Sequence, residues 1–154
     1  RVGFVVPRQA SGAANVGLAH MAGRRDDRVG AERHVADAGR DEVTCEVVRL
    51  DDAGVPGGVA FMKCDIEGAE LLALRGATGV LERDAPVLLL EVNPWFLEGY
   101  GLGVRDVLGF LAERGYSPFR FAGGRLVPVA AGDVEGNVVF VSPRRADRVA
   151  PLLA

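Results

Sequence analysis

Three acidic side chains at the ends of two apolar runs mark the part of this chain that could do chemistry. Asp65 and Glu67 follow the apolar run 59–62, and Glu91 lies near the end of a second apolar run, 87–92. If the two runs are neighbouring parallel strands, their carboxyl ends meet at one edge of a sheet, which is where α/β proteins bind ligands. Two carboxylates brought together there could bind a metal ion, orient a substrate hydroxyl or share a proton.

The elements that would position these residues alternate between strand and helix. The run 59–62 is almost wholly apolar, which is typical of a strand covered on both faces. No helical pattern precedes the last strand, so we expect it to run antiparallel to its neighbours. Together these signals predict an α/β fold whose sheet is mostly parallel with an antiparallel last strand. Apolar spacing places its elements as helix 67–82, strand 87–92, helix 103–114 and strands 116–121 and 138–141.

The front of the chain differs from the rest. Strand-like residues begin at once, at 2–6, and a second run rich in β-branched residues covers 43–50. Between them a polar stretch, 23–41, predicts a long connection. We therefore expect a single partial domain, the later part of a longer protein. Its segments are a variable, loop-rich lead-in over 1–42, an α/β core over 43–142 and a terminal helix or tail over 143–154.

Composition narrows the classes of partner. The chain has 18 basic and 21 acidic residues, a net charge of −3, so we expect the arginines within 24–33 to form a solvated face and not a nucleic-acid surface. No apolar stretch approaches the roughly 20 residues that cross a bilayer, so we expect no membrane partner. Cys45 and Cys64 lie in apolar runs and are expected to be buried free thiols in a reducing cytoplasm. His20 and His34 lack the spacing of metal ligands.

Four motifs together resemble one known family. They lie at 49–52 (Arg-Leu-Asp-Asp), 63–70 (Lys-Cys-Asp-Ile-Glu-Gly-Ala-Glu), 74–77 (Leu-Arg-Gly-Ala) and 86–91 (Pro-Val-Leu-Leu-Leu-Glu). In combination they resemble the FkbM family of S-adenosylmethionine-dependent methyltransferases, over about residues 43–142. The combination is far more specific than any one of the motifs.

The resemblance implies a class I methyltransferase fold, a Rossmann-like sheet with an antiparallel last strand, and S-adenosylmethionine as the cofactor. It implies that 59–65 is the fourth strand and 87–92 the fifth, and that the reaction methylates a hydroxyl oxygen on a small molecule or sugar. The family's glycine-rich loop and its ribose-binding acidic residue have no counterpart here, so we expect the first half of the fold to be absent. We therefore expect the complete protein to bind S-adenosylmethionine more tightly than these 154 residues do.

By that resemblance the candidate catalytic residues are Asp65, Glu67 and Glu91, with Asp65 as the general base. Asp65 and Ile66 are the candidate cofactor contacts. Methyl transfer needs the acceptor oxygen aligned with the methyl group, and a base helps when the acceptor is an alcohol. Structural interpretations stand beside these roles: Asp65 could cap the following helix, and Glu67 could interact with its dipole. Glu70 is expected to be structural.

We expect the substrate side at the same edge of the sheet. The candidate substrate-binding residues are Lys63, Asn93 and Trp95. Lys63 is a cation in an apolar run, and pairing with Asp65 or Glu91 is the simpler explanation for it. Asn93 and Trp95 follow the second apolar run and would shape an acceptor pocket, although Trp95 could also be a core or lid residue.

Two other functions stay open. Asp65, Glu67 and Glu91 could hold a divalent cation for a hydrolase or lyase, but no histidine or further carboxylate cluster supports them, so we expect no metal. A non-catalytic remnant that serves as an interaction module is the other possibility. The acceptor and the oligomeric state are not readable from the sequence. Surface loops commonly decide substrate choice, which here points to 7–42 and 93–103.

Overall fold

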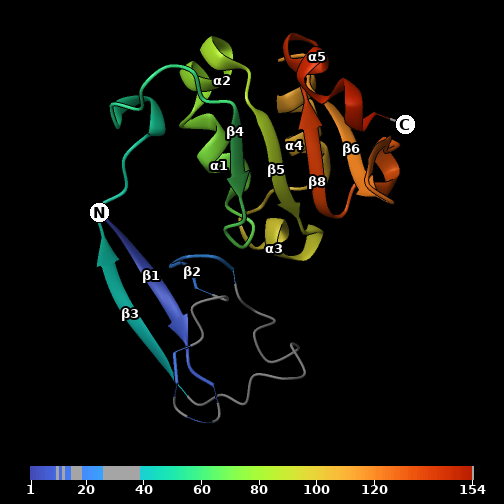
Figure 1. Cartoon of the computed structure of the whole chain (residues 1–154). Helices are drawn as coiled ribbons and strands as arrows, with labels where there is room; N and C mark the ends of the chain where they lie inside the picture. Colours follow the sequence, from blue (N-terminus) through green and yellow to red (C-terminus); the bar gives the residue numbers. More distant parts are fainter. Residues whose placement is uncertain (10, 12, 15–18, 26–38, 154) are drawn as a thin grey trace.

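The computed structural model describes residues 1–9, 11, 13–14, 19–25 and 39–153, which contain two sheets (Figure 1). A three-stranded sheet has the order β2-β1-β3, and a five-stranded sheet, the large sheet, has the order β4-β5-β8-β6-β7. Most of the connection expected over 23–41, with His34, lies outside the described residues. The strands are β1 (Val2–Pro7), β2 (His20–Met21), β3 (Arg40–Cys45), β4 (Phe61–Cys64), β5 (Val87–Val92), β6 (Ser117–Ala122), β7 (Arg125–Pro128) and β8 (Gly136–Val141). The helices are α1 (Glu70–Arg75), α2 (Thr78–Asp84), α3 (Pro94–Gly99), α4 (Val104–Ala112) and α5 (Ala146–Val149).

The large sheet is mixed. β4 and β5 run parallel, whereas β8 runs antiparallel to β5 on one side and to β6 on the other. β6 and β7 form an antiparallel hairpin that turns at Gly123 and Gly124. The prediction of an antiparallel last strand is confirmed. The prediction of a mostly parallel sheet holds only in part. β4, β5 and β6 run in the same direction, but β8 lies between β5 and β6, so β4 with β5 is the single parallel pair among the described strands of this sheet.

Alternation along β5 shows which face of the large sheet packs into the main core. Leu88, Leu90 and Val92 are buried, whereas the intervening side chains, Glu91 among them, are half-buried. Burying such an aliphatic side chain stabilises the fold by roughly 1.5–3 kcal/mol. Next to β5, β4 leaves 54% of Phe61 exposed, so the prediction of a strand covered on both faces is wrong. Helices α1 and α4 share the core with β5 and β8, through Leu71, Leu74, Val107 and Leu111.

The helix expected over 67–82 is two short helices. α1 begins only at Glu70, and α2 follows after a break at Gly76, which is the C-cap of α1. Glu67 precedes α1 with a φ of 58°, so the prediction that it lies in the first helical turn is wrong. Glu70 does lie in that turn. None of the helices in the described part of the chain is long and apolar enough to cross a membrane.

Asp51 fixes the start of α2 from a distant part of the chain. Residues Leu50–Asp52 form a short 3-10 helix, and the Asp51 carboxylate accepts the backbone N–H groups of Gly79 and Val80, both at 3.0 Å. These groups belong to the first turn of α2, where N–H groups have no acceptor within the helix. The same bonds, that from Gly79 above all, lower the pKa of Asp51. The Arg-Leu-Asp-Asp segment is therefore a helix-capping element.

The strand expected over 43–50 lies closer to the amino terminus. β3 ends at Cys45, which lies opposite Val2 on β1. The ribbon of β1 and β3 stands away from the large sheet (Figure 1), so the prediction that Cys45 is buried is wrong, and its thiol is exposed. Cys64 is buried as expected, and burial raises the pKa of its thiol to about 12.

Asp84 joins the end of α2 to the segment before β4. Its carboxylate accepts the backbone N–H groups of Gly58 at 3.1 Å and Val59 at 3.2 Å, and it pairs with Arg83 at 2.8 Å. The Arg83 guanidinium, followed by these N–H groups, holds the pKa of Asp84 well below its usual range. The Asp84 carbonyl oxygen accepts from Arg145 at 2.7 Å, which satisfies an open carbonyl at the helix end.

We expect Asp84→Asn to lower the free energy of unfolding at neutral pH, because the amide loses the ion pair with Arg83. A carboxyl group whose pKa is lowered by folding stabilises the protein above its unfolded pKa of about 4, and this stabilisation is lost as pH falls through the folded value. The difference between wild type and variant should therefore shrink in acid. Urea unfolding in a series of increasingly acidic buffers measures it.

Asp147→Asn is the matched control, because the Asp147 side chain is exposed on α5. It should leave the unfolding free energy nearly unchanged at every pH. A difference between wild type and Asp84→Asn that stays constant into strong acid would show that the carboxylate charge is not the cause.

Candidate functional site

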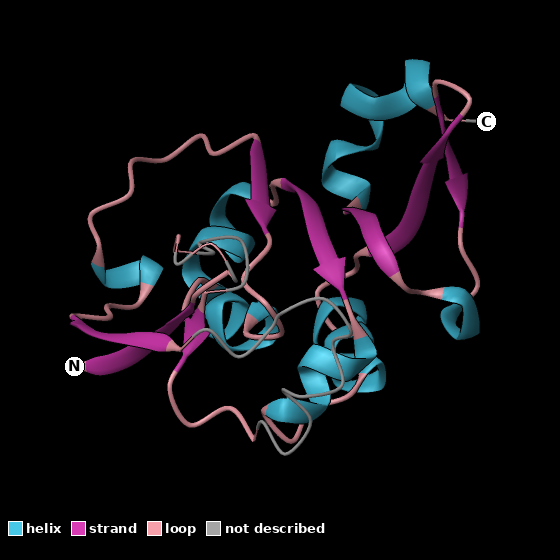
Figure 2. Cartoon of the chain, turned by 90° about the horizontal axis from the view of Figure 1, so that it is seen from below, coloured by secondary structure: helices cyan, strands magenta, loops and turns pink. Residues whose placement is uncertain are grey.

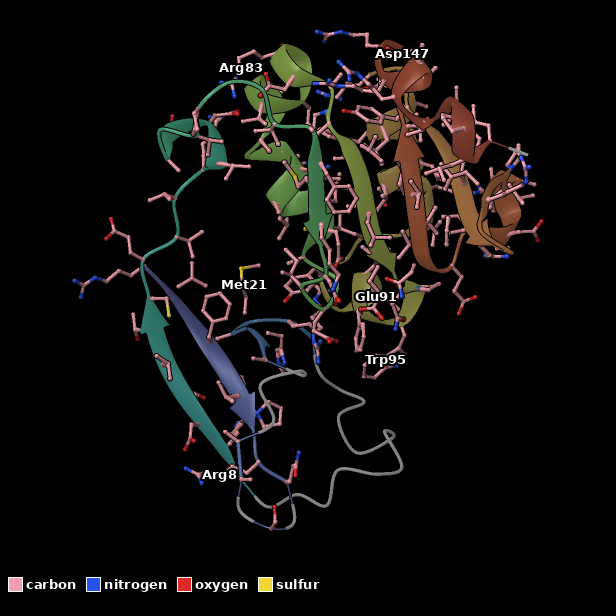
Figure 3. All side chains as sticks on the ribbon, viewed as in Figure 1. Arg8, Met21, Arg83, Glu91, Trp95 and Asp147 are labelled. Atoms are coloured by element: carbon pink, nitrogen blue, oxygen red, sulfur yellow. The ribbon has the colours of Figure 1, made fainter. Side chains whose placement is uncertain are left out.

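The candidate site lies where β4 and β5 end. Lys63 on β4 lies opposite Leu89 on β5, and Glu91 follows two residues later, so Lys63 and Glu91 project from the same face. Helices α1 and α4 pack on the opposite face. Asp65 follows two residues after Lys63, just past the end of β4. Figure 3 shows Glu91 and Trp95 close together at this edge of the sheet.

Three carboxylates meet at this edge. One oxygen each from Asp65, Glu67 and Glu91 lies within 4.8 Å of the other two, so the structure brings together the three candidate catalytic residues. Lys63 Nζ lies 2.8 Å from Asp65 Oδ2, which confirms the expected pairing of this lysine. The two side chains are 55% and 38% exposed, so solvent screens the ion pair and its effect is electrostatic tuning more than stability.

The carboxyl groups of Asp65 and Glu91 have opposite pKa shifts. The Lys63 ammonium is the largest cause that holds the pKa of Asp65 below its ordinary value, and contact with Glu91 adds to it. Burial raises the pKa of Glu91, and contact with Asp65 and the negative charge of Glu70 raise it further. A pair of this kind holds its first proton on Glu91 and keeps Asp65 ionised.

Glu70 holds the loop between β4 and α1. Its side chain is 2% exposed, and its Oε1 atom accepts the backbone N–H groups of Ile66 at 2.9 Å and Gly68 at 3.3 Å. The expectation that Glu70 is structural is confirmed. The capping interpretation of Asp65 is wrong, because the N-cap of α1 is Ala69, which makes no side-chain cap.

Gly68 packs this loop closely against α3. A β-carbon at residue 68 would lie 2.4 Å from the carbonyl carbon and oxygen of Phe96, and the φ of Gly68 is 95°. Both facts exclude a side chain there. The preceding residue, Glu67, has a φ of 58°, a conformation that costs a non-glycine residue roughly 1–2 kcal/mol. The buried Glu67 carboxylate is thus held in place by a strained backbone that the contact with α3 maintains.

Asn93 begins a helix. Its Oδ1 atom accepts the backbone N–H groups of Trp95 at 3.0 Å and Phe96 at 3.5 Å, and Pro94 occupies the first helical position. The segment expected as a loop over 93–103 therefore starts with helix α3. The rings of Trp95 and Phe96 meet edge to face, with centroids 5.1 Å apart. Asn93 and Trp95 thus lie beside the carboxylates, with Asn93 engaged as a helix cap.

Arg24 is the residue of this region that the sequence did not single out. Expected on a solvated face, it instead contacts the carbonyl oxygen of Glu67 and the rings of Trp95 and Phe96. Arg24 and Glu67 are 43 residues apart in the sequence. No local pattern distinguishes Arg24 from the neighbouring Arg25, so the sequence carries no signal for it.

A separate hollow of about 600 Å³ lies between the β6–β7 hairpin and the short 3-10 helix Ala131–Asp133. The Arg120 side chain donates to the Asp133 carbonyl oxygen at 3.0 Å across it. Its lining combines these charged residues and Glu135 with apolar groups of β7 and the following loop. None of the three clustered carboxylates lines it, so it is distinct from the candidate site.

Comparison with known proteins identifies the family. The model of the methyltransferase FkbM domain matches residues 6–118, well over half of the chain, and these residues include the strand ends that carry the carboxylates. A mixed α/β fold with this match defines a methyltransferase domain. The chain belongs to the FkbM methyltransferase family. The match begins and ends earlier than the region 43–142 expected from the motifs. No curated protein and no solved structure matches the chain.

We expect Gly68→Ala to destabilise the protein more than Gly54→Ala does. Both glycines have positive φ, but a β-carbon at residue 54 would meet nothing within 4 Å, whereas one at residue 68 would collide with the Phe96 backbone. The backbone conformation alone costs roughly 1–2 kcal/mol. Urea unfolding of the two variants separates this cost from the collision, and equal losses of unfolding free energy would contradict the seating of Gly68 on α3.

Proposed function

We propose that this protein transfers a methyl group from S-adenosylmethionine to a hydroxyl oxygen of a small molecule or sugar. Membership of the family supports methyl transfer. The observation that carries the proposal is the carboxyl pair of Asp65 and Glu91. Asp65 follows β4 and Glu91 lies near the end of the parallel strand β5. Their oxygens lie within 4.8 Å of each other, and the Lys63 ammonium pairs with Asp65. The pair combines an ionised carboxylate with a partner that holds its proton more firmly. Methylation of an alcohol is helped by one group that accepts the hydroxyl proton and by a second group that orients the hydroxyl.

Asp65 is the proposed general base. The Lys63 ammonium keeps the carboxylate ionised, and the side chain is exposed enough for an acceptor hydroxyl to reach it. As the acceptor oxygen forms its new bond to carbon, its proton becomes acidic and passes to an Asp65 oxygen. A weak base suffices, because alignment of the acceptor supplies much of the acceleration. When bound, S-adenosylmethionine would supply the methyl group from a positively charged sulfur, whose bond to the methyl carbon breaks as the sulfur leaves as a neutral thioether.

Glu91 and Glu67 orient the acceptor in this proposal. Glu91, whose pKa is raised by burial and by contact with Asp65, forms a hydrogen bond that orients the acceptor, while Asp65 accepts the acceptor proton. Glu67 is buried, so it acts on the placement of groups within the cluster and not on a proton from solvent. Asn93 and Trp95 shape the acceptor pocket from α3.

Asp65 and Ile66 are the proposed cofactor contacts in this chain. Ile66 leaves 39% of its surface exposed directly beside the Asp65 carboxylate. Apolar surface next to a carboxylate fits a ligand that combines a flat ring with hydroxyl and charged groups. The Ile66 N–H bond to Glu70 holds this surface in place. The described residues thus fit one side of S-adenosylmethionine.

A divalent cation at the same carboxylates is the second candidate. Three oxygens within 4.8 Å of one another are of the type that Mg²⁺ or Mn²⁺ prefers. The Lys63 ammonium already pairs with one of the three carboxylates, which favours methyl transfer over this alternative. A hydrolase or lyase of that kind would need an added divalent cation, so the metal dependence of activity separates the two functions.

Asp65→Asn should lower the rate of methyl transfer by at least about 100-fold, because the amide cannot take up the acceptor proton. Glu91→Gln keeps a hydrogen-bond donor and should cause a smaller loss. Initial rates with the complete protein, S-adenosylmethionine and a panel of hydroxyl acceptors measure both, with circular dichroism to confirm the fold. Glu82→Gln, an exposed carboxylate on α2, is the isosteric control. Wild-type activity in Asp65→Asn would remove this residue from the catalytic role.

Lys63→Met should raise the pKa of the Asp65 carboxyl group, because the ammonium is the largest cause of its lowering. Carboxyl ¹³C NMR titration should place the Asp65 midpoint below the ordinary 3.8 in the wild type and at higher pH in the variant. Arg75→Met removes an exposed cation at the end of α1 and should leave that midpoint in place. If Lys63→Met did the same, the ion pair would not be the cause of the shift.

A further inference from the structure

A short segment from the front of the chain crosses α3. We call residues 20–25 the crossing segment. It starts with β2, which pairs with β1. At its other end the Arg25 N–H donates to the carbonyl oxygen of Gly99, the last residue of α3, at 2.7 Å. In Figure 1, β2 lies between the ribbon of β1 and β3 and the foot of the large sheet. The crossing segment thus ties the small sheet to the helix beside the carboxylates.

Arg24 contacts the Glu67 loop and two rings of α3 from the crossing segment. Its Nη1 atom donates to the Glu67 carbonyl oxygen at 3.4 Å. The centre of its guanidinium lies 5.8 Å from the centroid of the Trp95 ring and 5.2 Å from that of Phe96. A planar guanidinium suits this place, since its charge interacts with the ring faces while its N–H groups donate in its own plane. Arg24 therefore joins α3 to the loop that carries Glu67.

Gly99 leaves room for the Arg24 side chain. A β-carbon at residue 99 would lie 2.5 Å from Arg24 Cγ and 3.1 Å from Arg24 Cδ. The φ of Gly99 is outside the left-handed region, so its backbone would accept an alanine. The methyl group of an alanine at residue 99 would collide with the Arg24 side chain, which would have to move.

We propose that Arg24 is a positioning residue that directs the Glu67 side chain toward Asp65 and Glu91. The proposal rests on the proposed function, in which Glu67 orients the acceptor. Arg24 acts through the peptide group that follows Glu67, because the carbonyl oxygen of that group accepts its hydrogen bond. On the other side of this peptide group, Gly68 is seated on α3. Glu70 accepts the N–H group of the same peptide, so Arg24 restrains it together with Glu70 and the contact of Gly68 with Phe96.

The strained backbone of Glu67 makes such a restraint necessary. With a φ of 58°, this residue would relax toward an extended or helical conformation if nothing opposed it. Loss of Arg24 removes one restraint and lets the 67–68 peptide rotate, which displaces the Glu67 carboxylate from Asp65. A displacement of about 1 Å in a catalytic group can cost on the order of 100-fold in rate.

Trp95 provides a readout that does not depend on activity. It is the one tryptophan of the 154-residue chain, so its fluorescence reports on the ring that Arg24 covers. Arg24→Ala should change its emission and increase quenching by iodide. Arg25→Ala removes a positive charge from an exposed neighbour whose contact with α3 is a backbone hydrogen bond. It should leave the emission and the iodide quenching unchanged. Arg24→Lys keeps the charge without the planar guanidinium. Its changes in emission and quenching should be smaller than those of Arg24→Ala and larger than those of Arg25→Ala.

Hydrogen exchange tests the effect on the loop. The N–H groups of Ile66 and Gly68 donate to Glu70 and should exchange at least about 10-fold faster in Arg24→Ala than in Arg25→Ala, because the loop opens locally. Gly99→Ala should reproduce the fluorescence and exchange changes by displacing Arg24. Gly109→Ala on α4, where a β-carbon meets nothing within 4 Å, is its control and should reproduce neither.

Activity of the complete protein tests the role itself. Arg24→Ala should lower kcat at least about 10-fold and change the acceptor KM by less than about 3-fold, as expected when a group acts in the transition state more than in binding. Because Arg24 acts through Glu67, adding Arg24→Ala to Glu67→Gln should cause no further loss.

The outcomes separate this proposal from the proposed function. Equal fluorescence and exchange in Arg24→Ala and Arg25→Ala would overturn the positioning role, and so would rate losses for Arg24→Ala and Glu67→Gln that multiply in the double variant. If the wild type transfers no methyl group to any acceptor while the fluorescence and exchange differences appear, the proposed function fails and the placement of the Glu67 loop by Arg24 is supported.

Discussion

The candidate site depends on the close contact between Gly68 and Phe96, which leaves no room for a side chain at residue 68. The backbone of Gly68 lies so close to the carbonyl group of Phe96 that even a methyl group is excluded, and this contact holds the loop after β4 against α3. Asp65 and Glu67 are carried by that loop, which brings them to Glu91. Carboxyl groups this close favour a proton on one of them, which is why contact with Asp65 raises the pKa of Glu91. Backbone packing places the three groups within 4.8 Å, and the Lys63 ammonium offsets part of their negative charge.

Local patterns predicted those parts of the fold that neighbouring residues decide. The apolar run of β5 and the spacing along α4 each lie where the sequence placed them, and Gly115, with a φ of 76°, lies just past the predicted helix end at residue 114. The pairing of Lys63 with Asp65 follows from the period of two along a strand, which puts them on one face. The nearness of Glu91 follows from the parallel pairing of β4 and β5. For these residues the sequence is sufficient because no distant contact competes.

Long-range contacts decided the rest. Whether an apolar strand is covered on one face or two depends on where helices return, and α1 and α4 return to the same face of β5, which the sequence of β5 alone does not encode. Glu67 leaves the expected helix because Gly68 must meet Phe96, a residue of another element. Cys45 is exposed because β3, which carries it, is an edge strand of the three-stranded sheet among the described strands. Arg24 differs from Arg25 through its contacts with the rings of α3 and with the carbonyl oxygen of Glu67.

The ion pair of Arg83 with Asp84 lies far from the carboxylates. Figure 3 shows Arg83 at one end of the large sheet and Glu91 at the other. Substitutions at well-separated positions change the free energy of unfolding nearly independently. A substitution of one of the clustered carboxylates should therefore leave the contribution of the Arg83–Asp84 pair to folding nearly unchanged. The helix-end contact and the carboxylates can thus be altered independently of each other.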